Sequence, residues 1–284
     1  MHSPSDNGLI AVTGATGGVG GRVARRLAER GVTQRLVVRD ESRAPELDGA
    51  QVRVASGYAD GDGMRGALDG VRTLFLIPAH ETKDRVAEHA TAIDAAVTAG
   101  VQRIVYLSFL DATAESTFTF GRDHWHTEQH IRASGIPEFT FLRMSMYMDF
   151  IPLMASDDGV IAGPAGDGRV SVVARDDIAD AAAVVLTEAG HAGATYDMTG
   201  PEALTMAEMA AEISRATGRD VVFRNETLEE AYQSRSSFGA ADWEVEGWVT
   251  SYAAIATGEW SKVSDDIRRL TGHEPISFAE YLRR

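Results

Sequence analysis

A glycine-rich turn close to the start of the chain constrains the fold more than any other feature of the sequence. Residues 9–20 read Leu-Ile-Ala-Val-Thr-Gly-Ala-Thr-Gly-Gly-Val-Gly, a short apolar run followed at once by closely spaced glycines. Gly14 permits a tight turn after a buried strand, Gly17 lets a pyrophosphate approach the backbone, and Gly20 lets the next helix pack close to the sheet. The N–H groups at the start of that helix, and its dipole, favour a phosphate. The pattern predicts a dinucleotide-binding turn.

The residues after the turn support this interpretation. Apolar residues recur at helical spacing over residues 19–30, Gly31 ends that helix, and residues 35–38 have the pattern of a second strand. This strand–helix–strand unit has the length that a dinucleotide-binding motif requires. Further strands are predicted near residues 51–55, 72–77, 102–107 and 138–143, with helices near residues 62–69, 83–99 and 122–134. The alternation predicts an α/β fold built on a doubly wound parallel sheet of the Rossmann type.

The sequence predicts that the chain leaves this sheet and later returns to it. A helix is expected at residues 176–188 and a strand at residues 195–198. The NAD(P)-binding core is therefore expected to comprise residues 1–150 and 172–199.

A smaller substrate-binding lobe is expected to comprise residues 151–171 and 200–284. Residues 163–168 are rich in glycine and predict a turn or hairpin loop. Helix-start signatures, in which a glutamate follows three residues after a hydroxyl side chain, begin at Thr205, Thr227 and Ser277. They predict that this lobe is mostly helical.

The composition excludes several classes of function. The chain has 284 residues, of which 44% are hydrophobic and 24% charged, enough to bury a full core. Its formal net charge of −15 would repel a phosphate backbone, which argues against general binding to nucleic acid or to an anionic membrane. No apolar run approaches the length of a membrane span, and residues 1–7 form a polar arm, so we expect a cytoplasmic protein. The absence of cysteine excludes disulfides, thiolate catalysis and cysteine-ligated metal.

The end of the second strand indicates which nucleotide is bound. An acidic residue there would hydrogen-bond the ribose 2′-OH of NAD, but the chain has Arg39, followed by Asp40 and Arg43. The planar fork of donors on an arginine suits a 2′-phosphate. We therefore predict that NADP(H) is preferred, with Arg22 as a further contact. The alternative, in which Arg39 is a solvated charge and Asp40 binds the ribose of NAD(H), stays open.

Motifs spread along nearly the whole chain resemble those of a known family. They are Gly14–Gly20, Tyr58–Asp60, Ala99–Val105, Asp123-His124 with Thr127-Glu128, Ser134–Ile136, Leu142-Arg143, Gly163–Gly168, Arg175–Ile178 and Leu270–His273. Together they resemble the NmrA-like atypical short-chain dehydrogenases, most closely the quinone and triphenylmethane reductases of that family. The resemblance implies a Rossmann-type domain that holds NADPH, a small lobe that closes a cleft over the nicotinamide, and no flavin. It also implies direct hydride transfer to an aromatic acceptor.

The resemblance further implies which residues bind the cofactor. They are Gly14, Ala15, Thr16, Gly17, Gly18, Val19, Arg39, Tyr58, Ile77, Pro78, Ser108 and His124. Typical short-chain dehydrogenases protonate a carbonyl with the tyrosine of a Tyr-x-x-x-Lys pair, but the corresponding residues here are Phe120-Gly-Arg-Asp-His124. Because phenylalanine donates no proton, His124 is the candidate catalytic residue, either as a proton donor or as an orienting group at the nicotinamide ribose. A structural role for His124 is the alternative.

An apolar cluster follows the strand near residues 138–143, at the strand end that forms the cleft. Methionine and aromatic side chains make adaptable walls for flat substrates. Substrate contacts are predicted for Phe109, Leu110, Tyr147, Met148 and Phe150, whereas ordinary packing is the alternative for Met144 and Met154. Trp243 and Trp248 fit either a lid or the core. His126 and His130 have the spacing of two ligands on one helix face, but with no matching third ligand they predict no metal site.

These observations predict an NADPH-dependent oxidoreductase that transfers hydride to a quinone or a related conjugated aromatic. Positioning alone supplies roughly 7–11 kcal/mol of a barrier in favourable reactions, and an aromatic hydroquinone is a stable product. Two alternatives stay open: a non-catalytic redox sensor that binds NAD(P), and a ketone, imine or quinone-tailoring enzyme of a biosynthetic pathway. The expected partner is a small aromatic substrate rather than nucleic acid or membrane, and a homodimer is possible.

Overall fold

The computed structural model describes residues 8–284 and divides them into two compact units. The first unit comprises the described residues up to Ser108, with Asp123–Arg143 and Ile178–Tyr196; the second comprises Phe109–Arg122, Met144–Asp177 and Asp197–Arg284. The polar arm predicted at residues 1–7 lies outside the described residues. Among residues 8–284, no helix has the length and hydropathy needed to cross a membrane.

The first unit is built on one sheet with the strand order β3-β2-β1-β4-β5-β6-β9. Its strands are β1 (Ile10–Thr13), β2 (Gln34–Val38), β3 (Ala50–Val54), β4 (Thr73–Leu76), β5 (Arg103–Phe109), β6 (Glu138–Met144) and β9 (Thr195–Met198). Neighbours from β3 to β5 run parallel, and Val12 in β1 is in register with Leu36 on one side and Phe75 on the other. The strand order reverses between β1 and β4. In open sheets of this kind, ligands bind beyond the carboxyl ends of the strands at such a point.

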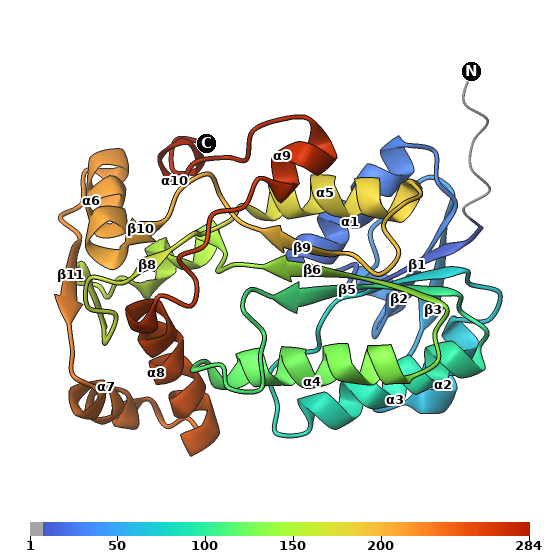
Figure 1. Cartoon of the computed structure of the whole chain (residues 1–284), viewed down its shortest axis with the longest axis horizontal. Helices are drawn as coiled ribbons and strands as arrows, with labels where there is room; N and C mark the ends of the chain where they lie inside the picture. Colours follow the sequence, from blue (N-terminus) through green and yellow to red (C-terminus); the bar gives the residue numbers. More distant parts are fainter. Residues whose placement is uncertain (1–7) are drawn as a thin grey trace. The chain divides into compact units, whose positions relative to one another are not determined.

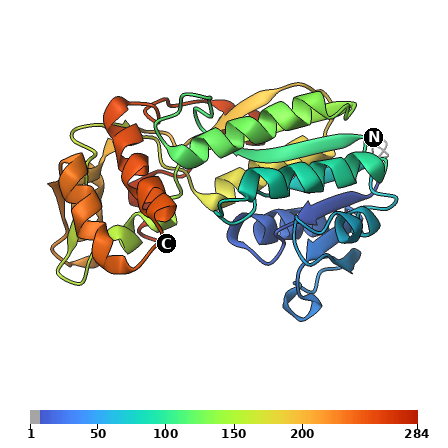
Figure 2. The same cartoon turned by 90° about the horizontal axis from the view of Figure 1, so that it is seen from below.

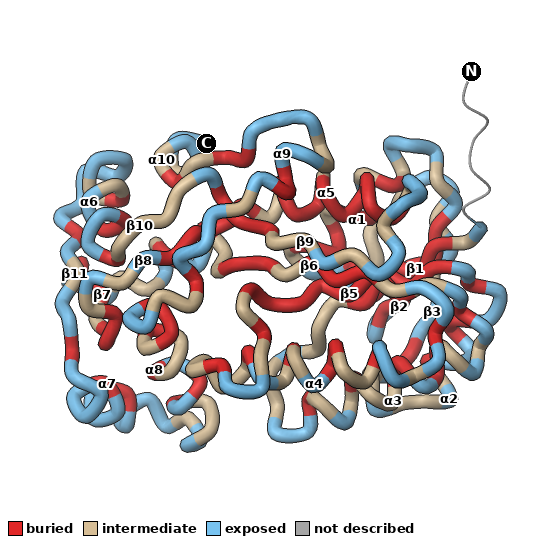
Figure 3. Tube along the Cα trace, in the orientation of Figure 1, coloured by how far each residue is buried: buried red, intermediate tan, exposed pale blue. Residues whose placement is uncertain are grey.

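Helices cover both faces of the sheet, as Figure 1 shows. One face carries α2 (Gly61–Ala67), α3 (Arg85–Thr98) and α4 (Thr119–Ala133), and the other carries α1 (Gly18–Glu29) and α5 (Arg175–Thr187). Strands β1 and β2 are buried along their whole length, as expected for parallel strands covered on both faces. The buried trace in Figure 3 follows these strands. The doubly wound α/β fold predicted from the sequence is confirmed.

The second unit contains two small sheets and most of the remaining helices, seen from another side in Figure 2. β7 (Val160–Gly163) pairs in parallel with β11 (Val222–Asn225), and β8 (Arg169–Val170) pairs antiparallel with β10 (Leu204–Thr205). Residues 163–168 therefore turn between two different sheets, and the hairpin expected as one option is wrong. The helices are α6 (Met206–Thr217), α7 (Leu228–Arg235), α8 (Asp242–Thr257), α9 (Asp266–Thr271) and α10 (Phe278–Tyr281). Short 3-10 turns are η1 (Glu41–Arg43), η2 (Met148–Phe150), η3 (Pro152–Met154) and η4 (Ser236–Phe238).

Three helices of the second unit begin where the sequence predicts. The Thr205 hydroxyl accepts a hydrogen bond from the N–H of Glu208 at 3.1 Å, and the Glu208 carboxylate accepts one from the N–H of Thr205 at 2.8 Å. Thr227 begins α7 with the same reciprocal pair, and Ser277 caps α10. The predicted helix starts are confirmed, because these caps depend only on residues close together in the sequence.

The segment Phe109–Arg122 belongs to the second unit, although the sequence analysis expected it in the core. Its aromatic side chains explain the difference. The ring of Phe118 lies 5.2 Å from that of Trp260, and Phe120 lies 6.0 Å from Trp243. The segment is thus packed on residues more than a hundred positions further along the chain, which local sequence patterns do not reveal.

Candidate functional site

The predicted dinucleotide turn joins β1 to α1. Gly14 has a φ of +59°, a region that favours glycine. The N–H of Gly17 donates to the Gly14 carbonyl at 2.8 Å and closes the turn. A Cβ on Gly20 would lie 2.3 Å from the same carbonyl oxygen, so a side chain there would push α1 away from the strand. Gly14 and Gly20 thus have the conformational roles predicted for them.

The start of α1 suits an anion. Its N-cap residue, Gly17, has an extended backbone, no side chain caps the helix, and no acidic residue occupies its first turn. The peptide N–H groups there and the helix dipole favour negative charge. Of the residues predicted to bind the cofactor here, Gly14, Thr16 and Gly17 are exposed, Gly18 is half-buried, and Ala15 and Val19 are buried. The backbone of the exposed members is accessible to a ligand, whereas the side chains of the buried pair are packed in the interior.

The residues that follow β2 bear on the choice of nucleotide. Arg39 and Asp40 are both exposed, and the Asp40 carboxylate turns back onto its own chain. Its Oδ1 accepts hydrogen bonds from the Ser42 hydroxyl at 2.7 Å and from the Ser42 N–H at 3.0 Å, and these bonds lower the pKa of Asp40. An oxygen of the acid that would bind a ribose is therefore already engaged. Arg22, the further contact predicted, donates from Nη1 to the Gly18 carbonyl at 2.8 Å.

Tyr58 and Ile77 lie together at the carboxyl ends of the strands. The Tyr58 hydroxyl lies 2.5 Å from the Ile77 carbonyl oxygen and 2.6 Å from the Thr13 hydroxyl, and the Ile77 N–H donates to Thr13 Oγ1 at 2.9 Å. Burial raises the pKa of Tyr58 well above its usual value. Its hydroxyl thus fixes the start of the loop after β4, in which Ile77 and Pro78 are half-buried.

His124 is enclosed in the first unit, with 2% of its surface exposed. Its Nδ1 lies 2.8 Å from the Tyr106 hydroxyl. Burial, and then the positive charge of Arg85, lower the pKa of His124 well below its usual value. The imidazole is therefore neutral at neutral pH. A neutral imidazole can orient a neighbour, but it has no imidazolium proton to donate.

Ser108 takes part in a buried ion pair that the sequence analysis did not identify as part of the site. Its hydroxyl donates to Glu128 Oε1 at 2.6 Å. Arg143, at the end of β6, donates from Nε to Oε1 at 2.9 Å and from Nη2 to Oε2 at 2.7 Å. Glu128 is fully buried and its negative charge is balanced by this bidentate pair. The sequence signal that could have identified this ion pair is Glu128, a charged residue on the buried side of α4.

Two further polar residues of the first unit were missed on α3. The buried face of α3 includes Arg85 and His89, whereas Val86 and Ala90 are half-buried. The N–H of Ala79 donates to His89 Nε2 at 2.8 Å. These side chains thus reach the loop after β4, close in sequence to Ile77 and Pro78.

The residues predicted to contact a substrate all belong to the second unit. Phe109 is buried against Phe118 and Trp260, with ring centroids 5.3 and 5.0 Å away. Leu110 and Met148 are also buried. These three side chains are packed, so the exposed surface of the predicted group comes from Tyr147 and Phe150.

Tyr147 and Phe150 form a flat pair with a guanidinium over them. Their ring centroids are 6.1 Å apart and the planes differ by 13°. The guanidinium carbon of Arg175 lies 4.4 Å from the Tyr147 centroid and 5.5 Å from that of Phe150, and Arg175 Nη1 pairs with Asp149 at 2.6 Å. Phe150 is 47% exposed. The pair therefore offers aromatic surface to a planar molecule, with its orientation fixed by a cation–π contact.

Phe120, which the resemblance places where a typical relative has tyrosine, is a packing residue. Its ring lies 5.5 Å from Phe118 and 6.0 Å from Trp243. A Cβ on Gly247 of α8 would lie 2.5 Å from the Phe120 ring. Trp243 is thus held against Phe120, whereas Trp248 is 39% exposed.

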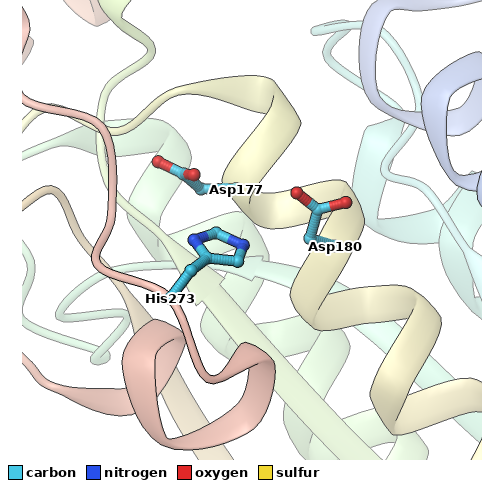
Figure 4. Close-up of side chains that lie close together, drawn as sticks. All are labelled: Asp177, Asp180 and His273. Atoms are coloured by element: carbon cyan, nitrogen blue, oxygen red, sulfur yellow. The ribbon is translucent and has the colours of Figure 1, made fainter. Parts of the chain in front are cut away.

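Figure 4 shows the acidic side chains Asp177 and Asp180 on successive turns of α5, together with His273. Each has another bond. Asp177 Oδ2 accepts from the N–H of Ile276 at 2.8 Å, Asp180 Oδ1 accepts from Nε of Arg26 at 2.7 Å, and His273 Nδ1 lies 3.0 Å from the carbonyl of the next residue. Because Asp177, Asp180 and His273 each bond to other groups of the protein, we assign no metal ion to them.

Comparison with known proteins extends over nearly the whole chain. A model of the NmrA-like family matches residues 6–280. Quinone oxidoreductase 2 of Escherichia coli is 34% identical over 279 residues, which cover 96% of each chain. The NAD(P)H azoreductase of Xenophilus azovorans is 32% identical over 279 residues, which cover 97% of each chain.

Solved structures give the same result. The NADPH complex of Escherichia coli quinone oxidoreductase 2 matches with a TM-score of 0.88 and 33% identity, covering 96% of this chain and 98% of the other. Triphenylmethane reductase of Citrobacter sp. with NADP(H) matches with a TM-score of 0.85 and 33% identity, covering 96% and 99%. The resemblance identified from sequence motifs is confirmed.

Proposed function

Because this chain belongs to the NmrA-like family, we propose that it is an NADPH-dependent oxidoreductase that transfers hydride directly to a quinone or a related conjugated aromatic. One observation carries the proposal: an uncapped glycine turn before α1 is combined with an exposed arginine, Arg39, directly after β2. These are the two features that a nicotinamide dinucleotide with a 2′-phosphate needs.

The first unit supplies a consistent set of contacts for this nucleotide. The backbone from Gly14 to Gly18 would hold the pyrophosphate, and Arg39 would hold the 2′-phosphate. The engagement of Asp40 with Ser42 supports NADP(H) over NAD(H). Tyr58 would act indirectly, because its hydroxyl fixes the Ile77 carbonyl.

Ser108 and His124 would also act indirectly in this proposal. The Ser108 hydroxyl orients Glu128, and His124 keeps a neutral imidazole against Tyr106. When bound, NADPH supplies the two electrons and the hydrogen of a hydride, so that the quinone needs one further proton to become a hydroquinone. In this proposal solvent would supply that proton, because the buried His124 is neutral and has no imidazolium proton to donate. The chain itself contributes binding and orientation, which reduction of an easily reduced acceptor requires most.

The printed names of the relatives support the substrate class. A quinone oxidoreductase, an azoreductase and a triphenylmethane reductase have flat, conjugated acceptors in common. In the second unit, Tyr147 and Phe150 would stack on such an acceptor. The side chains of Phe109, Leu110 and Met148 are buried and would offer less surface to the acceptor.

An anaerobic assay tests the proposal. The protein is mixed with NADPH and each member of a panel of quinones, without added flavin, and the absorbance at 340 nm is followed. We expect NADPH consumption above a protein-free control, slowed at low NADPH by Arg39→Gln and not by Arg65→Gln, an exposed arginine on α2. If the protein binds NADPH but reduces none of the acceptors, a non-catalytic redox sensor becomes the better-supported function. Absence of NADPH binding would refute both.

A further inference from the structure

The backbone of Ala79, in the loop after β4, is bound by side chains of α3 at both its N–H and its carbonyl. Its N–H donates to Nε2 of His89 at 2.8 Å, and its carbonyl accepts from Nε of Arg85 at 3.0 Å. His89 is fully buried and Arg85 is 3% exposed. A surface loop ordinarily meets its hydrogen-bonding needs with water or with its own backbone. Here two buried side chains fix the two successive peptide groups that flank the Cα of Ala79.

The hydrogen bonds of His89 define its tautomer. Because Nε2 accepts from Ala79, that nitrogen carries no proton, and the neutral ring must be protonated at Nδ1. Nδ1 lies 2.8 Å from the Thr127 hydroxyl oxygen, which in turn donates to the Asp123 carbonyl at 2.8 Å. Donors and acceptors therefore match along a chain from α4 to the loop. The imidazole is oriented to receive the Ala79 amide, and it cannot turn over without breaking its bonds to Thr127 and Ala79.

The buried guanidinium of Arg85 is poorly stabilised by its surroundings. Its Nη1 is buried without a hydrogen bond and lies 3.7 Å from Asp123 Oδ2, while its Nη2 lies 4.0 Å from Glu81 Oε1. Burying a guanidinium beside such loosely placed carboxylates costs free energy, which an apolar side chain would avoid. In contrast, Arg85 Nε makes a well-formed hydrogen bond to the Ala79 carbonyl. A role in placing that peptide accounts for an arginine at this position better than a role in stability does.

We propose that His89 and Arg85 are positioning residues that clamp the Ala79 peptide for the nicotinamide half of the bound nucleotide. The inference rests on the proposed function. The strand order reverses between β1 and β4, where ligands of such sheets bind, so the turn after β1 would hold the pyrophosphate. Arg39 after β2 would then hold the adenosine half, and the loop after β4 would receive the nicotinamide half. A loop fixed beforehand loses less conformational entropy when the nucleotide binds.

Substitutions on α3 test the clamp with two readouts. His89→Phe removes the acceptor, His89→Gln keeps an acceptor within reach, and Arg85→Met removes the guanidinium. The first readout is the exchange rate of the Ala79 amide hydrogen in nucleotide-free protein, measured by NMR. The second is the NADPH dissociation constant from a fluorescence titration, accompanied by KM for NADPH and for the quinone. His130→Gln, on α4, is the matched control.

We expect His89→Phe to speed exchange of the Ala79 amide at least tenfold. The NADPH dissociation constant should rise about three- to tenfold, the range for loss of one intramolecular hydrogen bond. KM for NADPH should follow, KM for the quinone should change less than twofold, and His89→Gln should restore much of both effects. Arg85→Met should weaken NADPH binding in the same direction.

Unchanged Ala79 exchange together with NADPH affinity within twofold of the parent would overturn the clamp. If His89→Phe does not fold, the same two readings on His89→Gln and Arg85→Met decide the question. A parent protein that binds no NADPH would instead sink the proposed function, and the exchange data would still report whether His89 holds the loop. The two failures are therefore distinguishable.

Discussion

The buried imidazole of His89 should make folding sensitive to acid in a way that one substitution reveals. Burial, and then the charge of Arg85, lower the pKa of His89 from 6.5 to about 3. In the unfolded chain His89 titrates near 6.5, so between pH 6.5 and pH 3 the unfolded state binds a proton that the native state does not. The free energy of unfolding therefore falls with falling pH, by about 1.4 kcal/mol per unit in this window. Between pH 7 and pH 5, His89 alone removes about 2 kcal/mol.

His89→Gln removes the titrating imidazole and leaves the neighbouring side chains unchanged. Tyr58, Tyr106, His124 and Arg85 face the imidazole and are common to both proteins, so the difference between them isolates His89. At pH 7 the variant should be less stable by about 1 kcal/mol, because a glutamine amide cannot reproduce both hydrogen bonds. At pH 5 that deficit should shrink by about 2 kcal/mol, so that the variant equals or exceeds the parent.

Urea unfolding at pH 7, 6 and 5 measures both free energies. His80→Gln is the control, because the His80 side chain is 89% exposed, and it should leave the pH dependence of the parent unchanged. A deficit of His89→Gln that is the same at pH 7 and pH 5 would refute the reasoning. It would mean that the fold accepts a protonated imidazole at His89.

Four further predictions concern single side chains. Arg39→Gln should raise the dissociation constant for NADPH ten- to a hundredfold and that for NADH less than threefold in fluorescence titrations, because a charged hydrogen bond to phosphate is lost; equal losses would contradict it. Gly20→Ala should lower the melting temperature, since its Cβ would meet the Gly14 carbonyl at 2.3 Å; an unchanged Tm would show that α1 shifts freely. Glu128→Gln should cost about 3 kcal/mol in urea unfolding by removing the buried charge that balances Arg143, and a cost below about 1 kcal/mol would argue against the buried pair. Phe150→Ala should raise KM for the quinone severalfold with NADPH affinity unchanged, and the reverse pattern would remove it from the acceptor site.

The sequence predicts those parts of the fold that depend on neighbouring residues. Gly14 needs a positive φ and Gly20 needs a close approach, and both requirements arise within one turn of chain. The hydroxyl caps at Thr205 and Thr227 are equally local. Short apolar runs that alternate with helices then predict a parallel sheet, because parallel strands that are buried on both faces have a continuous apolar pattern.

The polar interior of the first unit depends on distant residues and was missed. His89 joins the loop after β4 to Thr127 on α4, and Glu128 joins Arg143 on β6 to Ser108 on β5. In α3 the polar Arg85 is buried while its apolar neighbour Val86 is half-buried, a difference of one position along the helix. Where polar and apolar residues alternate along a helix, helical periodicity predicts the buried stripe only to within about one residue.

Direct hydride transfer from NADPH to a conjugated acceptor can be observed in a single turnover. A single turnover of the protein–NADPH complex with excess quinone is followed anaerobically at 340 nm, with NADPH carrying hydrogen or deuterium at the transferred position of nicotinamide C4. We predict that one NADPH is oxidised for each quinone reduced, without added flavin, and that deuterium slows this phase. NADPH oxidation no faster than in the protein-free control would contradict the account.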